Sequence, residues 1–268
     1  MLRSWTALAL LLVTNAVTAR VMAPPPMALR VAASDGVFVG TVTSIGDKLV
    51  AAELAPGDDR MMQIAEVTVS ESLLGSGSNK VKVGFFAPAG RRPGLTLTPK
   101  DVALFTLVKH PTKKEVYVAE MYYSVLRKAD DEDFKKQIEL AKSAVKMIAN
   151  PLEGLKSKEV DVRFNTAALL ITRYRTQRPG AKEQSVPLAE SKLILEALAA
   201  ADWSGRSSSP HLSPLALFGQ LGLTEKDGWT PPGDFNQFGP LASKWLKTNA
   251  ATFKLKRWSK VSTDSPEP

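Results

Sequence analysis

The stretch Gly36-Val-Phe-Val-Gly-Thr-Val-Thr-Ser-Ile45 decides the fold of the first half of the chain. Successive side chains of a β-strand point to opposite faces, so Val37 and Val39 share one face of this segment while Phe38 and Val42 share the other. This spacing of two predicts a strand. The segments that follow it decide which kind of sheet the strand joins.

The same spacing of two returns four more times before residue 124. Two of these segments alternate apolar with polar residues, and a third is apolar on both faces, as a central strand is. Clusters of glycine, proline, serine and aspartate lie between the segments and predict turns. Five short strands joined by turns favour a small closed sheet or barrel. The four further predicted strands are Ile64–Val69, Lys80–Phe85, Asp101–Val108 and Val116–Tyr123.

From residue 129 onward the apolar residues recur every three or four positions, which is the spacing of amphipathic helices. Pro151 and Gly154 are expected to mark the end of the first helix, and Ser213 followed by Pro214 is typical of a helix start. The predicted fold class is therefore α+β, with an N-terminal five-stranded OB-like β-barrel followed by an α-helical domain. The predicted helices cover 134–148, 160–177, 188–201, 215–221 and 238–249.

Residues 1–19 have the three parts of a secretory signal. Arg3 makes the start basic, an apolar run covers Trp5–Val13, and Val17-Thr-Ala19 ends with small residues at the expected places. The apolar run is shorter than the roughly 20 residues that span a bilayer. A buried N-terminal helix is the alternative, but it leaves the cleavage pattern unexplained. We expect a signal peptide cleaved after Ala19, a secreted or periplasmic protein, and no transmembrane anchor.

Shifts in composition divide the rest of the chain into four parts. We expect an N-terminal linker over 20–32, the OB-like barrel domain over 33–126 and the helical domain over 129–250. The last part, 251–268, is expected to be a tail that is basic at first and then flexible.

The composition excludes several kinds of chemistry. The chain has no cysteine, so it has no disulfide, thiolate nucleophile or cysteine-ligated metal. His110 and His211 stand in no metal-binding or catalytic spacing, and both are expected to be surface-loop residues. The acids of Asp130–Asp133 are expected to form a solvated first helical turn, since they lack the order of a calcium loop. No catalytic residue, metal site or cofactor is predicted. An exported chain without cysteine favours a bacterial envelope protein.

Five features of the first half, in this order, resemble the OB-like barrel of the netrin and tissue-inhibitor-of-metalloproteinase family: Asp35–Ser44, Glu66–Gly75, Val81–Phe85, Val102–Val108 and Tyr117. The resemblance covers about a third of the chain and implies the barrel fold. In the inhibitors of that family, an N-terminal cysteine chelates the zinc of the protease. The expected mature N-terminus here is Arg20, so the resemblance does not imply inhibition by that mechanism.

The helical half contains a phrase that is similar to a HEAT repeat, Leu155–Leu170. Val162-Arg163 followed by Ala167-Ala168 matches the start of the second helix of such a repeat, where the arginine reaches a preceding turn and the alanines allow close packing. No second copy follows at a period of about 40 residues, so we expect a compact helical subdomain rather than a solenoid.

The formal charge of +8 is concentrated near the C-terminus, where cations alternate with aromatic residues. Such a pattern binds anionic polymers or lipid surfaces. The alternative is that Trp245 and Leu246 pack the last helix onto the core and the lysines form its solvated face. The residues of this predicted anionic-partner patch are Lys244, Trp245, Lys247, Lys254, Lys256, Arg257, Trp258 and Lys260.

The sequence therefore predicts an exported, non-enzymatic binding or structural module of the bacterial cell envelope. Its expected partner is an anionic envelope polymer, a lipid surface or a protein, and not nucleic acid. Two alternatives remain open. One is a secreted hydrolase that uses a pair of carboxylates, which linear sequence does not reveal. The other is a protease-inhibitor-like module that inserts the loop Gly90–Gly94 into an active site.

Overall fold

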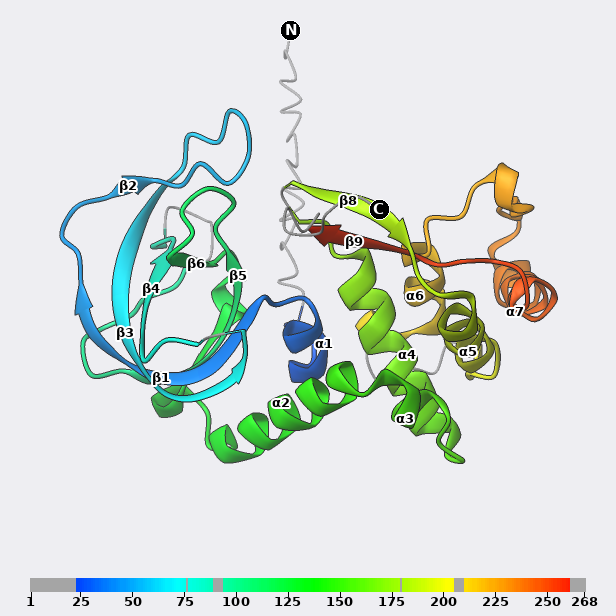
Figure 1. The fold of residues 1–268 in the computed structure, drawn as a ribbon, viewed down its shortest axis with the longest axis horizontal. Helices are drawn as coiled ribbons and strands as arrows, with labels where there is room; N and C mark the ends of the chain where they lie inside the picture. The colour runs from blue at the N-terminus through cyan, green and yellow to red at the C-terminus, as the bar shows by residue number, and fades with distance from the viewer. Residues whose placement is uncertain (1–22, 76, 89–93, 179, 205–209, 261–268) are drawn as a thin grey trace, which may run out of the picture.

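The computed structural model describes residues 23–75, 77–88, 94–178, 180–204 and 210–260. A barrel and a group of helices lie side by side, with the short helix α1 (Met27–Ala32) between them (Figure 1). The expected signal sequence over 1–19, the residues after Lys260 and residues 89–93 of the loop around Arg91 lie outside the described residues.

Five strands close into the predicted barrel. The strands pair in the order β1-β3-β4-β6-β5, and β5 pairs with β1 to complete the circuit. The pair β4–β6 is parallel and the other four pairs are antiparallel. The barrel strands are β1 (Gly36–Ile45), β3 (Met61–Leu74), β4 (Lys80–Phe85), β5 (Val102–Lys109) and β6 (Val116–Ala119).

Both faces of β1 are buried over its first half, which explains why the stretch Gly36–Ile45 is apolar on both sides. Phe38 and Val42 face the inside of the barrel, where the Phe38 ring stacks on Phe105 with 5.1 Å between centroids. Val37 and Val39 face outward and join a second cluster that α1 and two of the following helices complete. This outer face of β1 is the surface through which the barrel packs against the helical half.

The strand boundaries differ from the predicted ones at three places. β3 is longer than predicted, and a short strand β2 (Val50–Ala51) pairs with its start. β6 ends at Ala119, and a single helical turn over Tyr122–Ser124 follows where the prediction continues the strand. After that turn, β7 (Val125–Arg127) pairs with β5. The alternating pattern of 116–123 thus runs through a turn, which hydrophobic spacing alone does not separate from a strand.

The described part of the helical half contains the five predicted helices and one further short α-helix, α3. Ser213 and Pro214 begin α6 as expected, because the Ser213 hydroxyl accepts a hydrogen bond from the Ala216 N–H at 3.1 Å. Helix α2 ends just before Pro151, as expected, and Pro151 is also the first residue of α3. The helices are α2 (Phe134–Ala149), α3 (Pro151–Leu155), α4 (Val160–Arg175), α5 (Leu188–Ala199), α6 (Pro214–Gln220) and α7 (Phe238–Asn249).

The region expected to be an N-terminal linker contains α1. Met27, Leu29 and Val31 are buried against α2, α4 and the outer face of β1. The Arg30 guanidinium donates hydrogen bonds to the carbonyls of Pro25 and Tyr123 at 2.7 and 3.2 Å. Helix α1 therefore fills the space between the two halves.

The contacts made by the HEAT-like segment Leu155–Leu170 agree with those expected from its sequence. Arg163 at the start of α4 donates to the carbonyls of Ser157 and Lys158 at 2.8 and 2.9 Å, so it reaches the preceding turn. Ala167 is fully buried. Gly154 of α3 lies so close to Thr166 that an added Cβ would come within 2.2 Å of its hydroxyl. Small residues thus allow α3 and α4 to approach closely.

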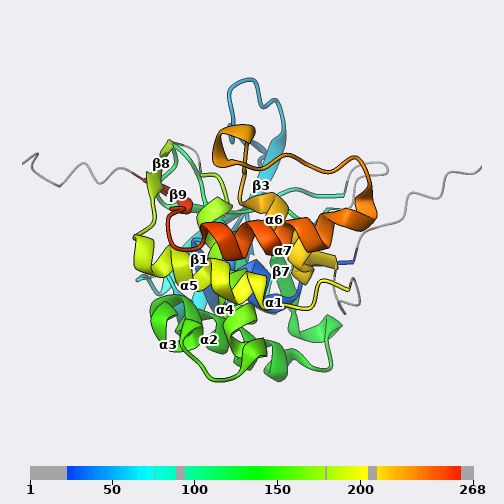
Figure 2. The ribbon, with the colours of Figure 1, turned by 90° about the vertical axis from the view of Figure 1, so that its right-hand side faces the viewer.

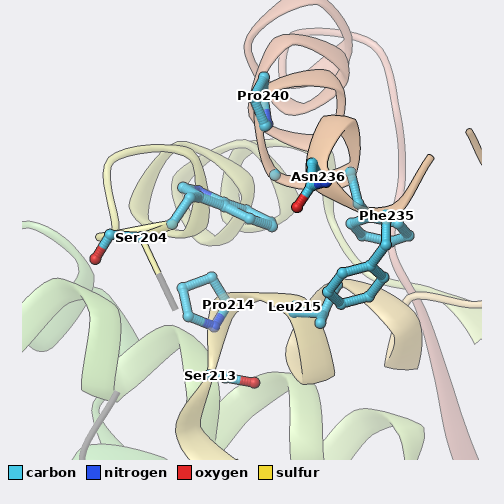
Figure 3. A pocket seen from close by; sticks show the side chains of 10 residues that line it. Ser204, Ser213, Pro214, Leu215, Phe235, Asn236 and Pro240 are labelled. Carbon is cyan, nitrogen blue, oxygen red and sulfur yellow. The ribbon is translucent and has the colours of Figure 1, made fainter. Parts of the chain in front are cut away.

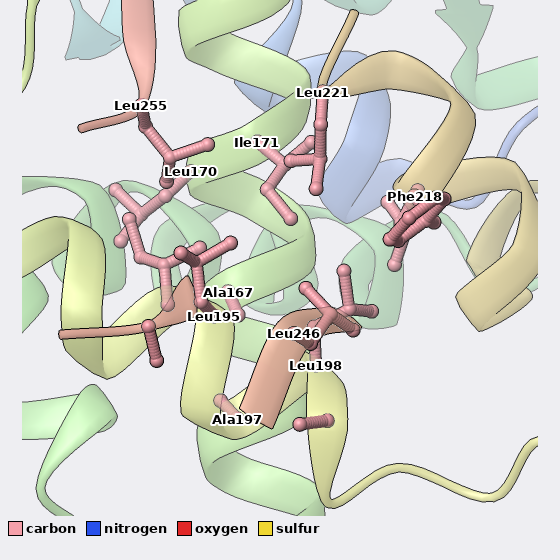
Figure 4. Close-up of a cluster of buried hydrophobic side chains, with 14 of the residues drawn as sticks. Ala167, Leu170, Ile171, Leu195, Ala197, Leu198, Phe218, Leu221, Leu246 and Leu255 are labelled. Carbon is pink, nitrogen blue, oxygen red and sulfur yellow. The ribbon is translucent and has the colours of Figure 1, made fainter. Parts of the chain in front are cut away.

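The core of the helical half gathers around α4, α5 and α7, with α5 packed against both of the others (Figures 2 and 4). Phe218 lies at the centre of the aromatic part of this core, and the centroids of the Trp229 and Trp245 rings lie 4.7 and 5.9 Å from its own. Leu255, which follows α7, is 2% exposed and closes this core. Within the described part of the chain, no helix has the length and apolar character to cross a membrane.

A two-stranded ribbon ends the helical half. Part of the segment expected to be a tail forms β9 (Lys256–Lys260), which pairs antiparallel with β8 (Ala181–Ser185). The ribbon packs on α4. The C-terminal cations of the predicted patch therefore belong in part to an ordered strand.

Candidate anion-binding site

The structure separates the residues of the predicted anionic-partner patch into two groups. Lys244, Lys247 and Lys254 are exposed on α7 and the loop after it. Trp245 is only 6% exposed, and its indole N–H donates to the Asp227 carbonyl at 3.0 Å. Trp245 is a core residue, as the alternative interpretation of the patch holds, and it offers no ring to a partner.

Arg257 and Trp258 belong to the second group and line a pocket between the two halves of the molecule. We call it the junction pocket, and its volume is about 360 Å³. Its lining contains four cations and one acid. The residues that line the junction pocket are Asp35, Lys109, Arg173, Tyr174, Arg178, Arg257, Trp258 and Ser259.

Four segments far apart in the sequence build this pocket. Asp35 precedes β1 and Lys109 ends β5, so the barrel supplies one wall. Arg173 lies in the last turn of α4, where a cation complements the negative end of the helix dipole, and Arg178 follows shortly after the helix end. Strand β9 supplies the remaining wall with Arg257, Trp258 and Ser259.

Two of the arginines hold the pocket together. Arg173 donates to the Ser34 carbonyl at 3.3 Å, and Arg178 donates to the Ala33 carbonyl at 2.7 Å. The Nε atom of Arg178 also lies 3.4 Å from a carboxylate oxygen of Asp35. Burial lowers the pKa of the Arg178 guanidinium from its ordinary value, and the charge of Asp35 opposes that shift. These contacts fix the end of α4 to the turn before β1.

Asp35 uses its carboxylate within the protein. One oxygen pairs with Arg178, and the other accepts a hydrogen bond from the backbone N–H of Lys109 at 2.9 Å. The acid therefore organises the barrel wall and leaves most of the positive charge of the pocket uncompensated.

The ribbon is fixed to α4 by ion pairs on the other side of the pocket. Glu183 of β8 contacts Arg175 at 2.9 Å and Lys256 at 3.5 Å. The hydrogen bond from Arg175 lowers the pKa of the Glu183 carboxyl, so this pair persists at neutral pH. The ion pairs hold β9 in the position from which Arg257 reaches the pocket.

Arg257 and Ser259 each have a buried side-chain atom without a hydrogen-bond partner among the described residues. They lie two residues apart in β9 and so share a face. The Nε atom of Arg257 and the hydroxyl of Ser259 are both buried, and neither has a hydrogen-bond partner in the described part of the chain. Buried polar atoms are nearly always paired, because an unpaired one costs about 1–3 kcal/mol.

Charge compensation is equally incomplete. Among the described residues, no carboxylate forms an ion pair with the side chain of Lys109, Arg173 or Arg257. Guanidinium groups bind carboxylate, phosphate and sulfate oxygens through paired N–H donors. The arrangement thus suits an anionic group of any of these three kinds.

Tyr174 contributes no acid–base chemistry to the pocket. Its hydroxyl donates a short hydrogen bond to the Glu190 carboxylate. Burial raises the pKa of Tyr174 above its ordinary value, and the bond to Glu190 raises it further. The hydroxyl therefore stays protonated and occupied. No histidine belongs to the described lining of the junction pocket.

A larger hollow, with a volume of about 570 Å³, lies between the start of α6, the segment after α5 and the start of α7 (Figure 3). Its described lining is mostly aromatic and aliphatic, with the polar residues Ser204, Ser213 and Asn236 among them, and the Phe235 side chain is 72% exposed. No carboxylate belongs to that described lining. The described lining of this hollow therefore does not supply the pair of acids on which the hydrolase alternative depends.

The expectation that His110 is a surface-loop residue is wrong. His110 is 3% exposed and its Nε2 atom lies 2.6 Å from the Ala52 carbonyl. Its Nδ1 atom accepts from the backbone N–H groups of Thr112 and Lys113 at 3.2 and 3.0 Å. These partners assign the neutral tautomer with the proton on Nε2. The imidazole pins the β5–β6 turn to the segment after β2.

Substitution of His110 by alanine is expected to lower the free energy of unfolding by about 1–3 kcal/mol, because three backbone groups lose their partner. Urea unfolding followed by circular dichroism measures the loss. His211, half-buried with one contact to the Ala23 carbonyl at 3.2 Å, is the matched control, and its alanine variant is expected to lose less. Equal losses for the two variants would contradict the role assigned to His110.

The acids of Asp130–Asp133 precede α2 rather than form its first turn, because that helix begins at Phe134 and its first turn contains no acid. Asp130 pairs with Arg127 at 2.6 Å, and the Asp131 carboxylate accepts from the backbone N–H of Asp133 at 2.7 Å. Within the described ranges, no group of three or more acidic or histidine side chains is placed to hold a metal ion.

Sequence reasoning found Arg257 and Trp258 but missed the rest of the pocket. The run Thr172-Arg-Tyr-Arg-Thr-Gln-Arg178 at the end of α4 was the available signal, since it places several cations at one helix terminus. Comparison with known proteins adds no relative: no family model matches the chain, and no curated protein matches it.

Proposed function

We propose that this protein is an exported, non-enzymatic binding module of the bacterial cell envelope that recognises an anionic group in the junction pocket. The observation that carries the proposal is a pocket of four cations and one acid, in which no described carboxylate pairs with the side chains of Lys109, Arg173 and Arg257. Such a pocket gains hydrogen bonds and charge compensation together when an anion enters it.

Two features of the sequence support the exported setting. Residues 1–19 have the layout of a secretory signal, and the chain has no cysteine. The envelope of bacteria offers several anionic polymers and surfaces to an exported protein. The proposed ligand class and the proposed location are therefore consistent with each other.

We also propose that the barrel shares its scaffold with the OB-like barrel of the netrin and tissue-inhibitor-of-metalloproteinase family. Its support is the closed circuit of five strands, in which the two quoted phrases Asp35–Ser44 and Glu66–Gly75 lie on the neighbouring strands β1 and β3. The relation concerns the scaffold. The inhibitory chemistry of that family needs a cysteine, and the chain has none.

Calorimetric titration of the purified protein with galacturonate, inorganic phosphate and sulfate tests the proposal. At least one of the three anions is expected to bind, and Arg257→Gln is expected to weaken that binding roughly ten- to hundredfold, as the loss of a charged hydrogen bond does. Lys254→Gln is the matched control, because it removes the same charge from an exposed position outside the pocket lining. Failure of all three anions to bind, or equal effects of the two variants, would overturn the proposal.

A further inference from the structure

A second basic hollow lies on the barrel beside the junction pocket. Its volume is about 540 Å³. We call it the barrel hollow, and its cations are Lys80, Lys82, Lys109 and Lys114. Strand β4 supplies the first two, and β5 and the turn after it supply the others. Lys109 lines both hollows, so the two share a wall.

The contacts around Lys109 show how the hollows adjoin. Lys109 pairs with Tyr117 across β5 and β6, and Tyr117 lines the barrel hollow. The backbone N–H of Lys109 binds Asp35, which lines the junction pocket. Burial raises the pKa of Tyr117, and the nearby charge of Asp35 raises it further. Asp35, Lys109 and Tyr117 thus form the boundary between the two hollows.

Positive charge prevails along the combined surface. The described linings of the two hollows together contain seven different cations and three acids. One of those acids, Glu115, forms an exposed ion pair with Lys82 at 3.6 Å. Lys80 and Lys114 are exposed and form no ion pair with any described residue. A ligand that carries charges at intervals would contact both groups of cations at once.

The shape of the surface decides between classes of polyanion. The cations line recesses, which a flexible chain can enter and the flat surface of a bilayer cannot follow. Single-stranded nucleic acid binds through several open aromatic rings along its path. Here Tyr117 is 7% exposed and the Tyr174 hydroxyl is occupied by Glu190, which leaves Trp258 as the available ring among the described lining residues. A chain of acidic sugars needs no such series of rings.

We infer that the junction pocket and the barrel hollow form one track for a linear acidic polysaccharide, with Lys109 at the point where the chain passes between them. The inference rests on the proposed function, because the junction pocket holds one acidic unit of the chain. The barrel hollow then holds a neighbouring part of the same chain. Linked units bind more tightly than separate ones, since the second contact is intramolecular.

Titration with oligogalacturonates of one, two, four and eight units tests the track, and sulfated oligosaccharides of the same lengths are run beside them. For at least one series, we expect the octamer to bind at least tenfold more tightly than the monomer. The double variant Lys80→Gln, Lys114→Gln is expected to reduce octamer affinity at least tenfold and leave monomer affinity unchanged. The double variant Lys244→Gln, Lys247→Gln removes two exposed charges from α7 and is expected to change neither.

The outcomes separate the two proposals. If the monomer binds but affinity does not rise with length, or if the two double variants act alike, the track is overturned and the proposed function stands. If neither monomer nor octamer binds in either series, the track is overturned, and the proposed function fails with it only where inorganic phosphate and sulfate do not bind either. Anionic phospholipid vesicles and an oligothymidylate of eight nucleotides are the comparison ligands. Binding of either that exceeds octamer binding and depends on Lys80 and Lys114 would also overturn the polysaccharide track.

Discussion

Replacement of Phe218 by alanine is expected to lower the free energy of unfolding of the helical half by about 3–5 kcal/mol. The ring is 2% exposed and lies at the centre of an aromatic cluster. Four rings meet it edge-on, so its removal leaves a cavity that none of them can fill by a small shift. The contacting rings are Trp203, Trp229, Phe238 and Trp245, at 6.1, 4.7, 5.8 and 5.9 Å between centroids.

Urea unfolding followed by tryptophan fluorescence measures this loss, because Trp229 and Trp245 contact the substituted ring. Phe235→Ala is the control. Phe235 is 72% exposed, so its removal is expected to change the free energy by no more than about 0.5 kcal/mol. A loss below about 1 kcal/mol for the Phe218 variant would contradict the central position of that ring, given the usual cost of a large core truncation.

Replacement of Gly75 by alanine is expected to damage both the barrel and the junction pocket. Gly75 has a φ of +71°, which favours glycine, and an added Cβ would lie 2.0 Å from the Asp35 carbonyl oxygen. The clash involves backbone on both sides, so β1 or β3 has to move. We expect a loss of more than about 2 kcal/mol in unfolding free energy. Because Asp35 anchors Arg178, we also expect anion binding to weaken.

The Gly57→Ala variant separates the cost of the left-handed backbone conformation from the cost of the steric clash. Gly57 has a similar φ of +79°, but nothing lies within 4 Å of its added Cβ. Its alanine variant is therefore expected to lose only about 1 kcal/mol, the cost of the left-handed conformation. Thermal unfolding of the two variants, with galacturonate, phosphate and sulfate titrations beside it, makes the comparison. Equal losses, with unchanged anion binding for Gly75→Ala, would contradict the close packing of the turn after β3 on Asp35.

The barrel was predictable because hydrophobic spacing reports burial directly. The segments around Val39, Val83 and Leu104 are buried, and their alternation or continuous apolar character survives in the structure as β1, β4 and β5. The five main helices of the second half followed for the same reason. Their apolar stripes at α2, α4, α5, α6 and α7 face shared cores.

The ribbon was not predictable in this way. Strand β8 reads Ala-Lys-Glu-Gln-Ser, with four of its five residues exposed, so its sequence carries no burial signal. It is a strand because its backbone pairs with β9 more than 70 residues later in the chain. The burial of His110 was not predictable for a related reason, since the carbonyl that it contacts belongs to Ala52, 58 residues away. Partners that distant leave no local pattern.

The candidate site was predictable only in part. The basic C-terminal segment drew attention to Arg257, but its neighbours in sequence are not its neighbours in the pocket. Trp245 turned into the core, while Lys109 and Arg178 joined from the barrel and from the end of α4. The charge pattern along a sequence reports a patch only when the cations share one element, and here they come from three segments.

Strand β9 is the last described element of the chain, yet it faces Asp35 at the start of the barrel across the junction pocket. A molecule clipped after Leu255 would keep every strand of the barrel and every α-helix but would lack Arg257 and Ser259. Under the proposed function, a molecule shortened in this way would lose anion binding while its barrel and helices remain. In a compartment with proteases, ligand capture would be confined to chains that have kept their C-terminal end.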